Sequence, residues 1–309
     1  MILCIGPTPA AQRVMVFHRL LLDAVNRAAT TLDGAAGKSV NVAKVLKALG
    51  EQPIATGFLG GNRGEYIGGV LLAKGIEGDF VKVAAGTRQC VTVIDEGTGA
   101  ITELVEESRP VPDSDYELLL EIITRRVRGC RAVVVSGTIT PGGPVDFYRR
   151  CVASAREAGA IPVVDATGPA LVEALKARPG LVKPNRAELM ATLGRELENE
   201  SDVVAAMREL QQRGAERVVV TAGKDPALAL DSSSAWRIRS ARIRPVNPIG
   251  SGDAFTAGLV WRLARGETLG EACRWAAAAG AANALSLLPG ELDLQDVERL
   301  ARETRVTPL

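Results

Sequence analysis

Short apolar runs alternate with segments of helical spacing along the central part of the chain. Each run is rich in β-branched residues, which favours a strand, and each intervening segment carries apolar residues three to four positions apart, which favours a helix. The predicted strands are 132–136, 161–165, 181–183 and 217–221, and the predicted helices are 144–157, 169–176, 186–193 and 201–213. Continuous apolar strands that alternate with helices predict an α/β fold whose mostly parallel central sheet is covered by helices on both faces.

The two ends of the chain extend this alternation. The N-terminal third predicts strands at 2–6 and 53–58 around a helix at 38–49. The C-terminal third predicts a hairpin, with strands 227–230 and 236–243, and then three helices, at 251–265, 268–285 and 293–303. Because no long linker or repeat interrupts the 309 residues, we expect a single α/β domain over residues 1–309.

Two stretches depart from the alternation. Residues 10–33 show no clear period, and residues 87–107 read as two strands, 89–95 and 100–105, joined by a turn. A hairpin that interrupts a series of βα units predicts a small accessory sheet, and such a sheet can serve as a lid over a ligand. We therefore expect a β-sheet lid built from about 10–33 and 87–107.

Composition and charge exclude several classes of protein. Hydrophobic residues make up 47% and charged residues 24%, which is typical of a soluble globular chain. Thirty-seven basic residues oppose 36 acidic ones, so no global field would hold nucleic acid or an anionic membrane. No targeting segment or membrane span is evident. We expect neither nucleic acid nor a membrane as a partner.

The few cysteines and the single histidine narrow the chemistry. Five cysteines are scattered without a CxxC pair, which argues against a zinc ribbon or a disulfide scaffold and favours the reducing cytoplasm. His18 is the only histidine, so a multi-histidine metal site is impossible. In an enzyme of this composition, acid–base work would fall to carboxylates. Electrophilic help would come from Lys, Arg, backbone N–H groups or a hard metal ion.

The segment from Asn247 to Phe255 is the most informative for chemistry. Gly250 and Gly252 permit a tight turn, and a helix begins near Asp253. The first N–H groups of a helix lack partners, so such a turn can bind an anion, and an adjacent carboxylate could take a proton from an attacking hydroxyl. The alternative is that Asp253 only caps the helix, because aspartate is a favoured N-cap residue.

A second segment, Gly37-Lys38-Ser39, matches the end of a P-loop, GxxxxGK[ST], and opens the first predicted helix. The match fails because Leu32 stands where the first glycine belongs and because no convincing strand precedes the loop. A loop of small residues that leads into a helix can still let a ligand approach the backbone closely. Asn41, one turn into this helix, is either near that ligand or an ordinary surface residue.

Three predicted strand ends carry small polar residues. After the strand at 181–183, Asn185 and Glu188 have the spacing of a capping box. The same oxygens could instead face a hydrated Mg²⁺, which prefers one or two carboxylates together with water and phosphate. The strands at 132–136 and 217–221 end in a hydroxyl residue with a glycine close behind. This is either ordinary turn chemistry or part of a ligand crevice at the carboxyl ends of the strands.

Six segments resemble the PfkB (ribokinase-like) carbohydrate kinases. AGKSVNVAKVLKALG is similar to the N-terminal signature GGKGxNVAxxLxxLG of this family, and VNPIGSGDAFTAGLVWRLARG to its C-terminal signature DTxGAGD. Between them, in the order and spacing of the family, occur VVVSGTITPG, VVDATGPAL, VKPNRAEL and VVVTAGKDPALAL. The resemblance covers nearly the whole chain. The KPNxxEL element points to the branch of 1-phosphofructokinase, tagatose-6-phosphate kinase and the minor 6-phosphofructokinase.

The resemblance implies a ribokinase-like fold, ATP and Mg²⁺ as cofactors, and a role for each matching residue. Asp253 would be the base that deprotonates a sugar hydroxyl. The anion hole for the transferred phosphate would be formed by Gly250, Ser251 and Gly252. Asn185 and Glu188 would hold Mg²⁺, directly or through water. The nucleotide would be approached at its phosphates by Lys183 and bordered by Thr221, Gly223 and Asn283.

On the substrate side, the resemblance implies a second set of residues. Those that would face the sugar are Gly37, Lys38, Asn41 and Thr138. Arg88 and Arg27 would hold a phosphate group already present on the substrate. The lid, which in this family often makes a dimer interface, would also join the chain into a homodimer.

The substrate side departs from the family pattern at three positions. This branch usually has NPxxD after the first strand, and its aspartate binds sugar hydroxyls. Gln12 takes the place of that aspartate here, and Ala36 and Ser39 stand where glycine is usual. The nucleotide side is intact. The departures therefore leave the identity of the sugar open.

We therefore expect an ATP- and Mg²⁺-dependent kinase that phosphorylates a hydroxyl of a sugar phosphate of the fructose 1-phosphate, fructose 6-phosphate or tagatose 6-phosphate type. One alternative is a kinase of an unphosphorylated sugar or nucleoside on the same fold. Another is a non-catalytic sugar or nucleotide sensor, which the altered Gln12 favours and the intact turn at Asp253 opposes.

Overall fold

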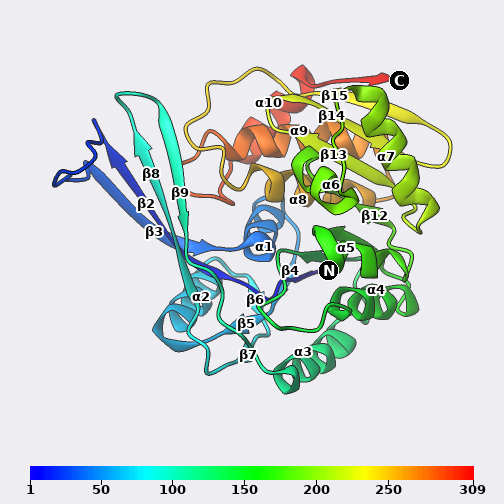
Figure 1. Cartoon of the computed structure of the whole chain (residues 1–309), viewed down its shortest axis with the longest axis horizontal. Coiled ribbons are helices and arrows are strands. Elements are labelled where there is room, and N and C mark those ends of the chain that lie inside the picture. Colours follow the sequence, from blue (N-terminus) through cyan, green and yellow to red (C-terminus); the bar gives the residue numbers. More distant parts are fainter.

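A ten-stranded sheet forms the centre of the computed structural model, which describes all residues 1–309 (Figure 1). Its strand order is β16-β15-β14-β13-β12-β11-β10-β1-β4-β6. The strands from β13 to β6 in this order are parallel, with the bounds Val218–Ala222 (β13), Leu181–Val182 (β12), Ile161–Asp165 (β11), Ala132–Ser136 (β10), Ile2–Ile5 (β1), Pro53–Thr56 (β4) and Glu77–Gly78 (β6). The antiparallel strands are Asp225–Leu230 (β14), Ala235–Arg239 (β15) and Arg305–Pro308 (β16).

Helices cover both faces of this sheet, as the alternation predicted. One face packs against α1 (Lys38–Ala48), α2 (Gly61–Ala73), α8 (Ser251–Leu263), α9 (Leu269–Asn283) and α10 (Leu294–Glu303). The other packs against α3 (Asp113–Arg126), α4 (Phe147–Glu157), α5 (Gly168–Leu175), α6 (Arg186–Leu193) and α7 (Glu200–Gln212). Side chains of a strand point to alternate faces, so Ile2 and Cys4 of β1 join the first core, whereas Leu3 and Ile5 join the second.

A separate four-stranded sheet, called the small sheet below, projects from the main body at the left of Figure 1. Its strand order is β3-β2-β8-β9, with the bounds Ala10–Phe17 (β2), Thr30–Ala36 (β3), Arg88–Asp95 (β8) and Ala100–Val105 (β9). The accessory sheet expected from 10–33 and 87–107 is therefore confirmed, while its action as a lid stays a prediction.

The central strand β2 explains why the first part of the 10–33 stretch, residues 10–17, showed no clear period. Helix α2 contacts β2, and Leu287 and Leu288 pack against Val14 and Val16 of the same strand. Because the strand is covered on both faces over most of its length, its polar and apolar positions do not alternate.

Several elements differ from the sequence expectations. Strand β3 leads directly to Gly37, although the sequence suggested that no strand precedes this loop; the P-loop match still fails at Leu32, which lies inside β3. The second strand of the C-terminal hairpin ends at Arg239. The elements that the sequence did not predict are α2, α3, β6, β16 and a two-stranded sheet of β5 (Phe58–Leu59) and β7 (Val81–Lys82). Helix α2 is rich in glycine, which lowers helix propensity.

All five cysteines are unpaired and buried. None of the helices combines the length and the apolar character needed to cross a membrane.

Candidate active site

The carboxyl ends of the parallel strands and the first turns of α1, α6 and α8 meet at one edge of the main sheet. β10 ends at Ser136, β11 ends at Asp165, and Lys183 directly follows β12. Side chains from the three helices reach these strand ends through hydrogen bonds and ion pairs. The structure thus brings the predicted strand-end and helix-start motifs to one place, which is where ligands of open α/β sheets bind.

Asp253 lies in the first turn of α8, and its side chain is buried. The Nδ2 atom of Asn41 donates a hydrogen bond to Asp253 Oδ2 at 2.7 Å. Since no side chain caps α8, the interpretation of Asp253 as a simple cap is not supported. Burial raises the pKa of Asp253 to about 6, against the opposing effect of Lys38. A carboxyl group with this pKa can accept a proton near neutral pH, as general-base catalysis requires.

The turn before α8 is shaped for an anion. Gly250 is the N-cap residue of α8 and has a φ of 82°. A Cβ atom on Gly250 would lie 2.7 Å from the Cβ atom of Pro289, so only glycine fits there. The N–H of Ser251 already donates to the carbonyl oxygen of Pro248 at 3.1 Å, so the N–H groups of α8 that could face an anion are those of Gly252 and Asp253. The anion hole expected at Gly250, Ser251 and Gly252 stays a prediction.

Asp165, which the sequence analysis did not single out, is the electrostatic centre of the site. Its buried carboxylate lies 2.9 Å from Lys38 Nζ and 3.0 Å from Lys183 Nζ. Thr256 Oγ1 donates a hydrogen bond to it at 2.7 Å. Burial alone would raise the pKa of Asp165, but the two ammonium groups hold it well below its usual range. The position of Asp165 as the last residue of a predicted parallel strand is the signal that could have revealed it.

Asn185 and Glu188 form the capping box that their spacing predicted. Asn185 Oδ1 accepts a hydrogen bond from the N–H of Glu188, and Glu188 Oε2 accepts one from the N–H of Asn185, both at 2.8 Å. The other carboxylate oxygen of Glu188 lies 3.1 Å from Lys38 Nζ, so Glu188 also faces the site.

The side-chain oxygen atoms of Asn185 and Glu188 determine which metal ions the site could hold. No group of three or more His, Cys, Asp or Glu side chains is placed to hold a metal ion. The donors of Asn185 and Glu188 therefore fit Mg²⁺ only together with water and phosphate oxygens, which is the arrangement that this ion prefers.

A second group of predicted residues gathers where β2 and β8 of the small sheet begin. Thr8 Oγ1 lies 3.4 Å from Thr138 Oγ1, and Arg88 Nη2 donates a hydrogen bond to the carbonyl oxygen of Thr8 at 3.2 Å. Arg88 Nε and Ser108 Oγ are buried without a hydrogen-bond partner. Both residues line one small cavity together with Thr8 and Thr140. A buried guanidinium N–H without an acceptor can be satisfied by a water molecule or by an anion, and the role of Arg88 in binding a phosphate stays a prediction.

Gln12, which replaces the usual aspartate, lies beside this group. Strand β2 places Gln12 on the same face of the small sheet as Arg88, because side chains alternate along paired strands. The side chain is buried, and its Nε2 atom donates a hydrogen bond to Thr92 Oγ1 at 2.8 Å. Gln12 is thus a neutral, fixed amide in the position of a carboxylate.

The loop that leads into α1 is closely packed around its glycines. Gly37 has a φ of 101°, and a Cβ atom there would lie 2.8 Å from the Cα atom of Pro9. Ser39 departs from the usual glycine and is accommodated by Gly6, where a Cβ atom would lie 2.3 Å from Ser39 Oγ. The structure gives no comparable reason for Ala36.

Some predicted residues lie at the margins of the site. Arg27 is exposed in the loop between β2 and β3, at the free end of the small sheet, and the structure does not bring it to the other residues (Figure 1). Thr221 forms a bridge with Asn185, and Gly223, with a φ of 62°, follows β13 in the turn to β14. The contacts of all three with a phosphate or nucleotide stay predictions.

Asn283 supports the turn from below. It is fully buried, its Nδ2 atom donates to the carbonyl oxygen of Ile249 at 3.0 Å, and its Oδ1 atom accepts from the N–H of Gly290 at 2.7 Å. The structure therefore places Asn283 under the turn at Gly250, and its direct contact with a nucleotide stays a prediction.

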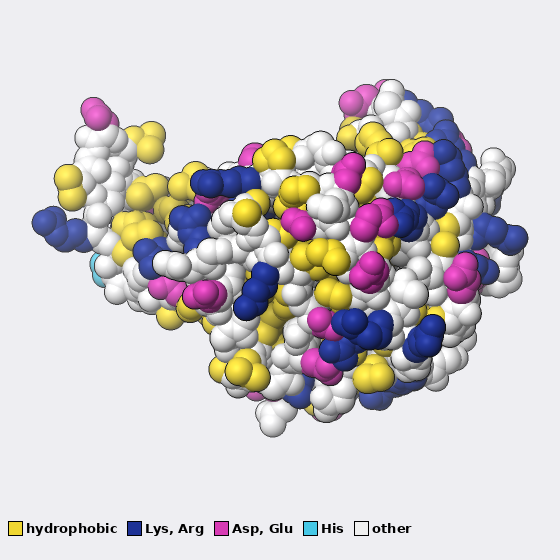
Figure 2. Space-filling view, turned by 90° about the horizontal axis from the view of Figure 1, so that it is seen from below, with side chains coloured by type: hydrophobic (Ala, Val, Ile, Leu, Met, Phe, Trp, Pro, Cys, Tyr) yellow, Lys and Arg dark blue, Asp and Glu magenta, His cyan; other side chains and the backbone are white.

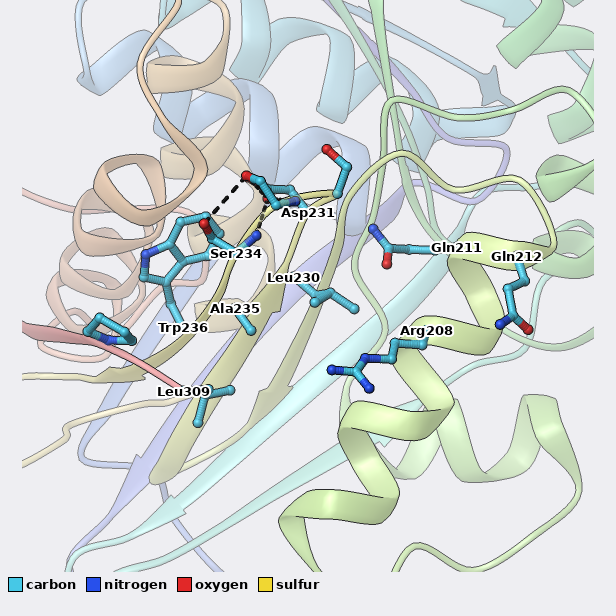
Figure 3. Close-up of a pocket in the computed structure, with 12 residues that line it drawn as sticks. Arg208, Gln211, Gln212, Leu230, Asp231, Ser234, Ala235, Trp236 and Leu309 are labelled. Atoms are coloured by element: carbon cyan, nitrogen blue, oxygen red, sulfur yellow. Dashed lines mark hydrogen bonds between the residues drawn. The ribbon is translucent and has the colours of Figure 1, made fainter.

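A surface depression of about 630 Å³ lies elsewhere, between the end of α7 and the start of β15 (Figure 3). Arg208 and Gln211 line one side of it, and Asp231 and Trp236 line another. Because β14 runs against the parallel strands and ends at this depression, it lies at the opposite edge of the sheet from Asp253. It contains none of the predicted site residues.

The comparisons with known proteins agree with these observations. Residues 1–293 match the pfkB family of carbohydrate kinases. A tagatose-6-phosphate kinase of Staphylococcus epidermidis is 29% identical, over 99% of this chain and 99% of that protein. A Thermotoga maritima structure described as a possible 1-phosphofructokinase has a TM-score of 0.92 at 26% identity, over 100% of this chain and 99% of that one. Phosphofructokinase-2 from Escherichia coli in complex with fructose-6-phosphate has a TM-score of 0.89 at 26% identity, over 97% of this chain and 98% of that one.

The structural matches confirm the ribokinase-like fold that the sequence signatures implied. The relatives are named kinases, which agrees with the predicted phosphotransferase activity. Because the family match extends over nearly the whole sequence, the chain belongs to the pfkB family and is a carbohydrate kinase, which transfers a phosphoryl group to an alcohol.

Proposed function

We propose that this protein is an ATP- and Mg²⁺-dependent kinase of a sugar phosphate of the fructose 1-phosphate, fructose 6-phosphate or tagatose 6-phosphate type. The observation that carries the proposal is the buried carboxyl group of Asp253, with a pKa of about 6, beside the uncapped glycine turn that opens α8. The named relatives act on such substrates: one is a tagatose-6-phosphate kinase, and another was solved with fructose-6-phosphate.

The mechanism follows from the arrangement around this turn. Phosphoryl transfer depends on positioning and charge neutralisation more than on covalent help from the protein. Asp253 would accept the proton of the attacking sugar hydroxyl, while Asn41 orients its carboxylate. The first N–H groups of α8 would hold the transferred phosphate. Lys38, which bridges Asp165 and Glu188, would supply positive charge near the same point.

Asn185 and Glu188 would hold Mg²⁺, directly or through water. When bound, this ion would neutralise part of the charge on the nucleotide phosphates. Lys183 is buried against Asp165 and would add a fixed positive charge on the nucleotide side. The role of Lys183 is therefore to balance charge from within the site.

The cavity at Arg88 favours a substrate that already carries a phosphate. Its unpartnered Nε atom, with the hydroxyl groups of Thr138 and Ser108 nearby, offers donors that an unphosphorylated sugar would leave unused. The cavity measures about 20 Å³, which is too little for a phosphate group, so a phosphate would reach the Arg88 guanidinium and form charge-assisted hydrogen bonds only if the cavity walls move apart.

A panel assay tests the proposal and its alternatives. ADP release would be measured with sugar phosphates, unphosphorylated sugars and nucleosides as acceptors, with Mg²⁺ present and with the ion chelated. We expect turnover with at least one sugar phosphate and none after chelation. Turnover only with unphosphorylated acceptors would favour the alternative kinase, and ligand binding without turnover would favour a sensor.

Replacing Arg88 by alanine should raise KM for the sugar phosphate by about 10–100-fold, because charge-assisted hydrogen bonds to the phosphate are lost. KM for ATP should stay unchanged. Arg13→Ala is the matched control, since Arg13 lies on the same small sheet but is exposed and pairs with Asp33. An unchanged KM in Arg88→Ala would exclude Arg88 from phosphate binding.

The small sheet is also the proposed interface of a homodimer. Its free end exposes large apolar side chains, with exposed fractions of 90% for Leu22 and 85% for Val25, and Leu104 and Val105 are half exposed. Figure 2 shows hydrophobic side chains on this projecting part of the molecule. A structure of Escherichia coli phosphofructokinase-2 is described as a tetrameric form.

Light scattering coupled to gel filtration should give a molar mass twice that of one chain. The Leu22→Glu variant should have the molar mass of a single chain. A monomeric wild-type protein at micromolar concentration would overturn the dimer.

A further inference from the structure

Helix α1 carries a second lysine, Lys44, whose side chain is almost completely buried, with an exposed fraction of 4% for the residue. Lys44 Nζ donates hydrogen bonds to the carbonyl oxygens of Ala35, at 2.9 Å, and Pro289, at 2.7 Å. It also lies 3.3 Å from Glu291 Oε1. Ala35 belongs to β3 of the small sheet, while Pro289 and Glu291 belong to the segment between α9 and α10. One ammonium group therefore joins three parts of the chain.

The segment that Lys44 contacts packs, at Pro289 and Gly290, against the glycine turn at Gly250 and against Asn41. A Cβ atom on Gly250 would lie 2.7 Å from the Cβ atom of Pro289, and a Cβ atom on Gly290 would lie 3.0 Å from the Cα atom of Asn41. Pro289 and Gly290 thus fill the space between the turn and Asn41, the residue that donates a hydrogen bond to Asp253. A shift of Pro289 and Gly290 would therefore move both the glycine turn and Asn41, which donates the hydrogen bond to Asp253.

An apolar side chain of similar volume could fill the space that Lys44 occupies, so packing alone does not explain its charge. A buried ammonium costs free energy unless it is paired and hydrogen-bonded, and well-packed apolar residues of similar volume are often as stable or more stable than buried ions. Burial lowers the pKa of Lys44, while Glu291 opposes this effect. The two carbonyl acceptors give the ammonium a directional task that methionine, of similar length, could not perform.

We propose that Lys44 is a positioning residue. Its ammonium group links Pro289 to β3 through hydrogen bonds and thereby fixes the glycine turn and Asn41 around Asp253. The inference rests on the proposed function, because the groups that it positions are the proposed base and anion turn. Lys44 itself touches neither the substrate nor the reacting atoms.

The test compares Lys44→Met with Lys74→Met. Lys74 is the matched control because its Nζ atom pairs with the same Glu291, at 2.9 Å, but its side chain is 38% exposed and it directly follows the end of α2. We expect Lys44→Met to lower kcat about 10–100-fold, since a displacement of about 1 Å at reacting groups can cost that much. KM for the sugar substrate should change by less than about threefold, because the substrate-phosphate contacts lie elsewhere. Lys74→Met should keep the wild-type kcat.

Hydrogen exchange in the ligand-free protein gives a second readout that needs no turnover. The amide N–H of Gly290 donates to Asn283 Oδ1, so it should exchange slowly in the wild type and in Lys74→Met, and clearly faster in Lys44→Met. Wild-type exchange of the 284–292 segment in Lys44→Met would overturn the inference, as would a wild-type kcat. If Lys44→Met does not fold, Lys44→Gln, which keeps a donor without the charge, is measured in the same way.

The two readouts separate this inference from the proposed function. If the wild type phosphorylates no acceptor in the panel, the proposed function fails, and the exchange measurement still decides whether Lys44 holds the segment. If the wild type is an active kinase and Lys44→Met is equally active, the positioning role fails and the proposed function stands.

Discussion

Replacing Asp253 by asparagine should lower kcat by about 10²–10⁴-fold, because the proposed base for the attacking hydroxyl is lost. Asparagine has nearly the same shape and can still accept the hydrogen bond from Asn41 Nδ2. Burial destabilises the charged form of Asp253 in the folded protein, and this raises its pKa to about 6. The variant should therefore unfold at the same or a higher temperature than the wild type at neutral pH. Steady-state kinetics and thermal unfolding, measured on the same preparation, check both statements.

The pH profile adds an independent check on Asp253. The base acts only when deprotonated, so kcat/KM of the wild type should be half-maximal near pH 6, reach a plateau at higher pH and fall roughly tenfold per unit at lower pH. The residual activity of Asp253→Asn should lack this limb. Near-normal turnover of the variant would remove Asp253 from the mechanism, and the phosphotransferase assignment of this turn would go with it.

Replacing Asp165 by asparagine should have the largest effect on stability. The carboxylate is 1% exposed and lies within 3.0 Å of two ammonium groups, Lys38 and Lys183. Removing one partner of a buried ion pair leaves the other charge unpaired, which costs about 3–5 kcal/mol. We expect the free energy of unfolding, measured by urea denaturation at neutral pH, to fall by about this amount.

Asp33→Asn is the control for this measurement. Asp33 also pairs with a cation, Arg13, at 2.7 Å, but both side chains are nearly half exposed, so its loss should cost about 1 kcal/mol or less. The pKa of Asp165 lies well below its usual range, so its contribution is present above the pKa of an unfolded aspartate and is lost as the pH falls. The difference between wild type and Asp165→Asn should therefore shrink in acid. Equal losses in the two variants would show that burial of the Asp165 network adds nothing.

Most of the main sheet could be predicted because its strands are apolar on both faces. β10 and β11 have the predicted bounds, and so does α6, whose capping box marked its start. The small sheet was harder. β3 carries polar residues, including Thr30 and Asp33, and its pairing with β2 cannot be read from local pattern. Local spacing identifies an element only where the burial of its faces follows a regular period.

The residues of the site also differ in how far the local sequence could predict them. The glycine turn and Asn185–Glu188 are local motifs, and their geometry could be predicted from spacing. Asp165 and Lys44 could not be assigned their roles, because each depends on contacts between segments that are distant in the sequence. The cavity at Arg88 has the same origin, since Thr8 and Ser108 reach it from different parts of the chain.

The parallel pairing of β2 with β8 has a consequence for the order of folding. The two strands are separated by two helices and several strands, so the chain between them must turn back before β8 can pair with β2. Such non-local pairing pays its loop-closure entropy before any contact is gained, so it forms slowly. During synthesis on a ribosome, the hairpin of β2 and β3 would keep an unpaired strand edge until β8 has emerged, and the small sheet would be among the last parts of the N-terminal half to form.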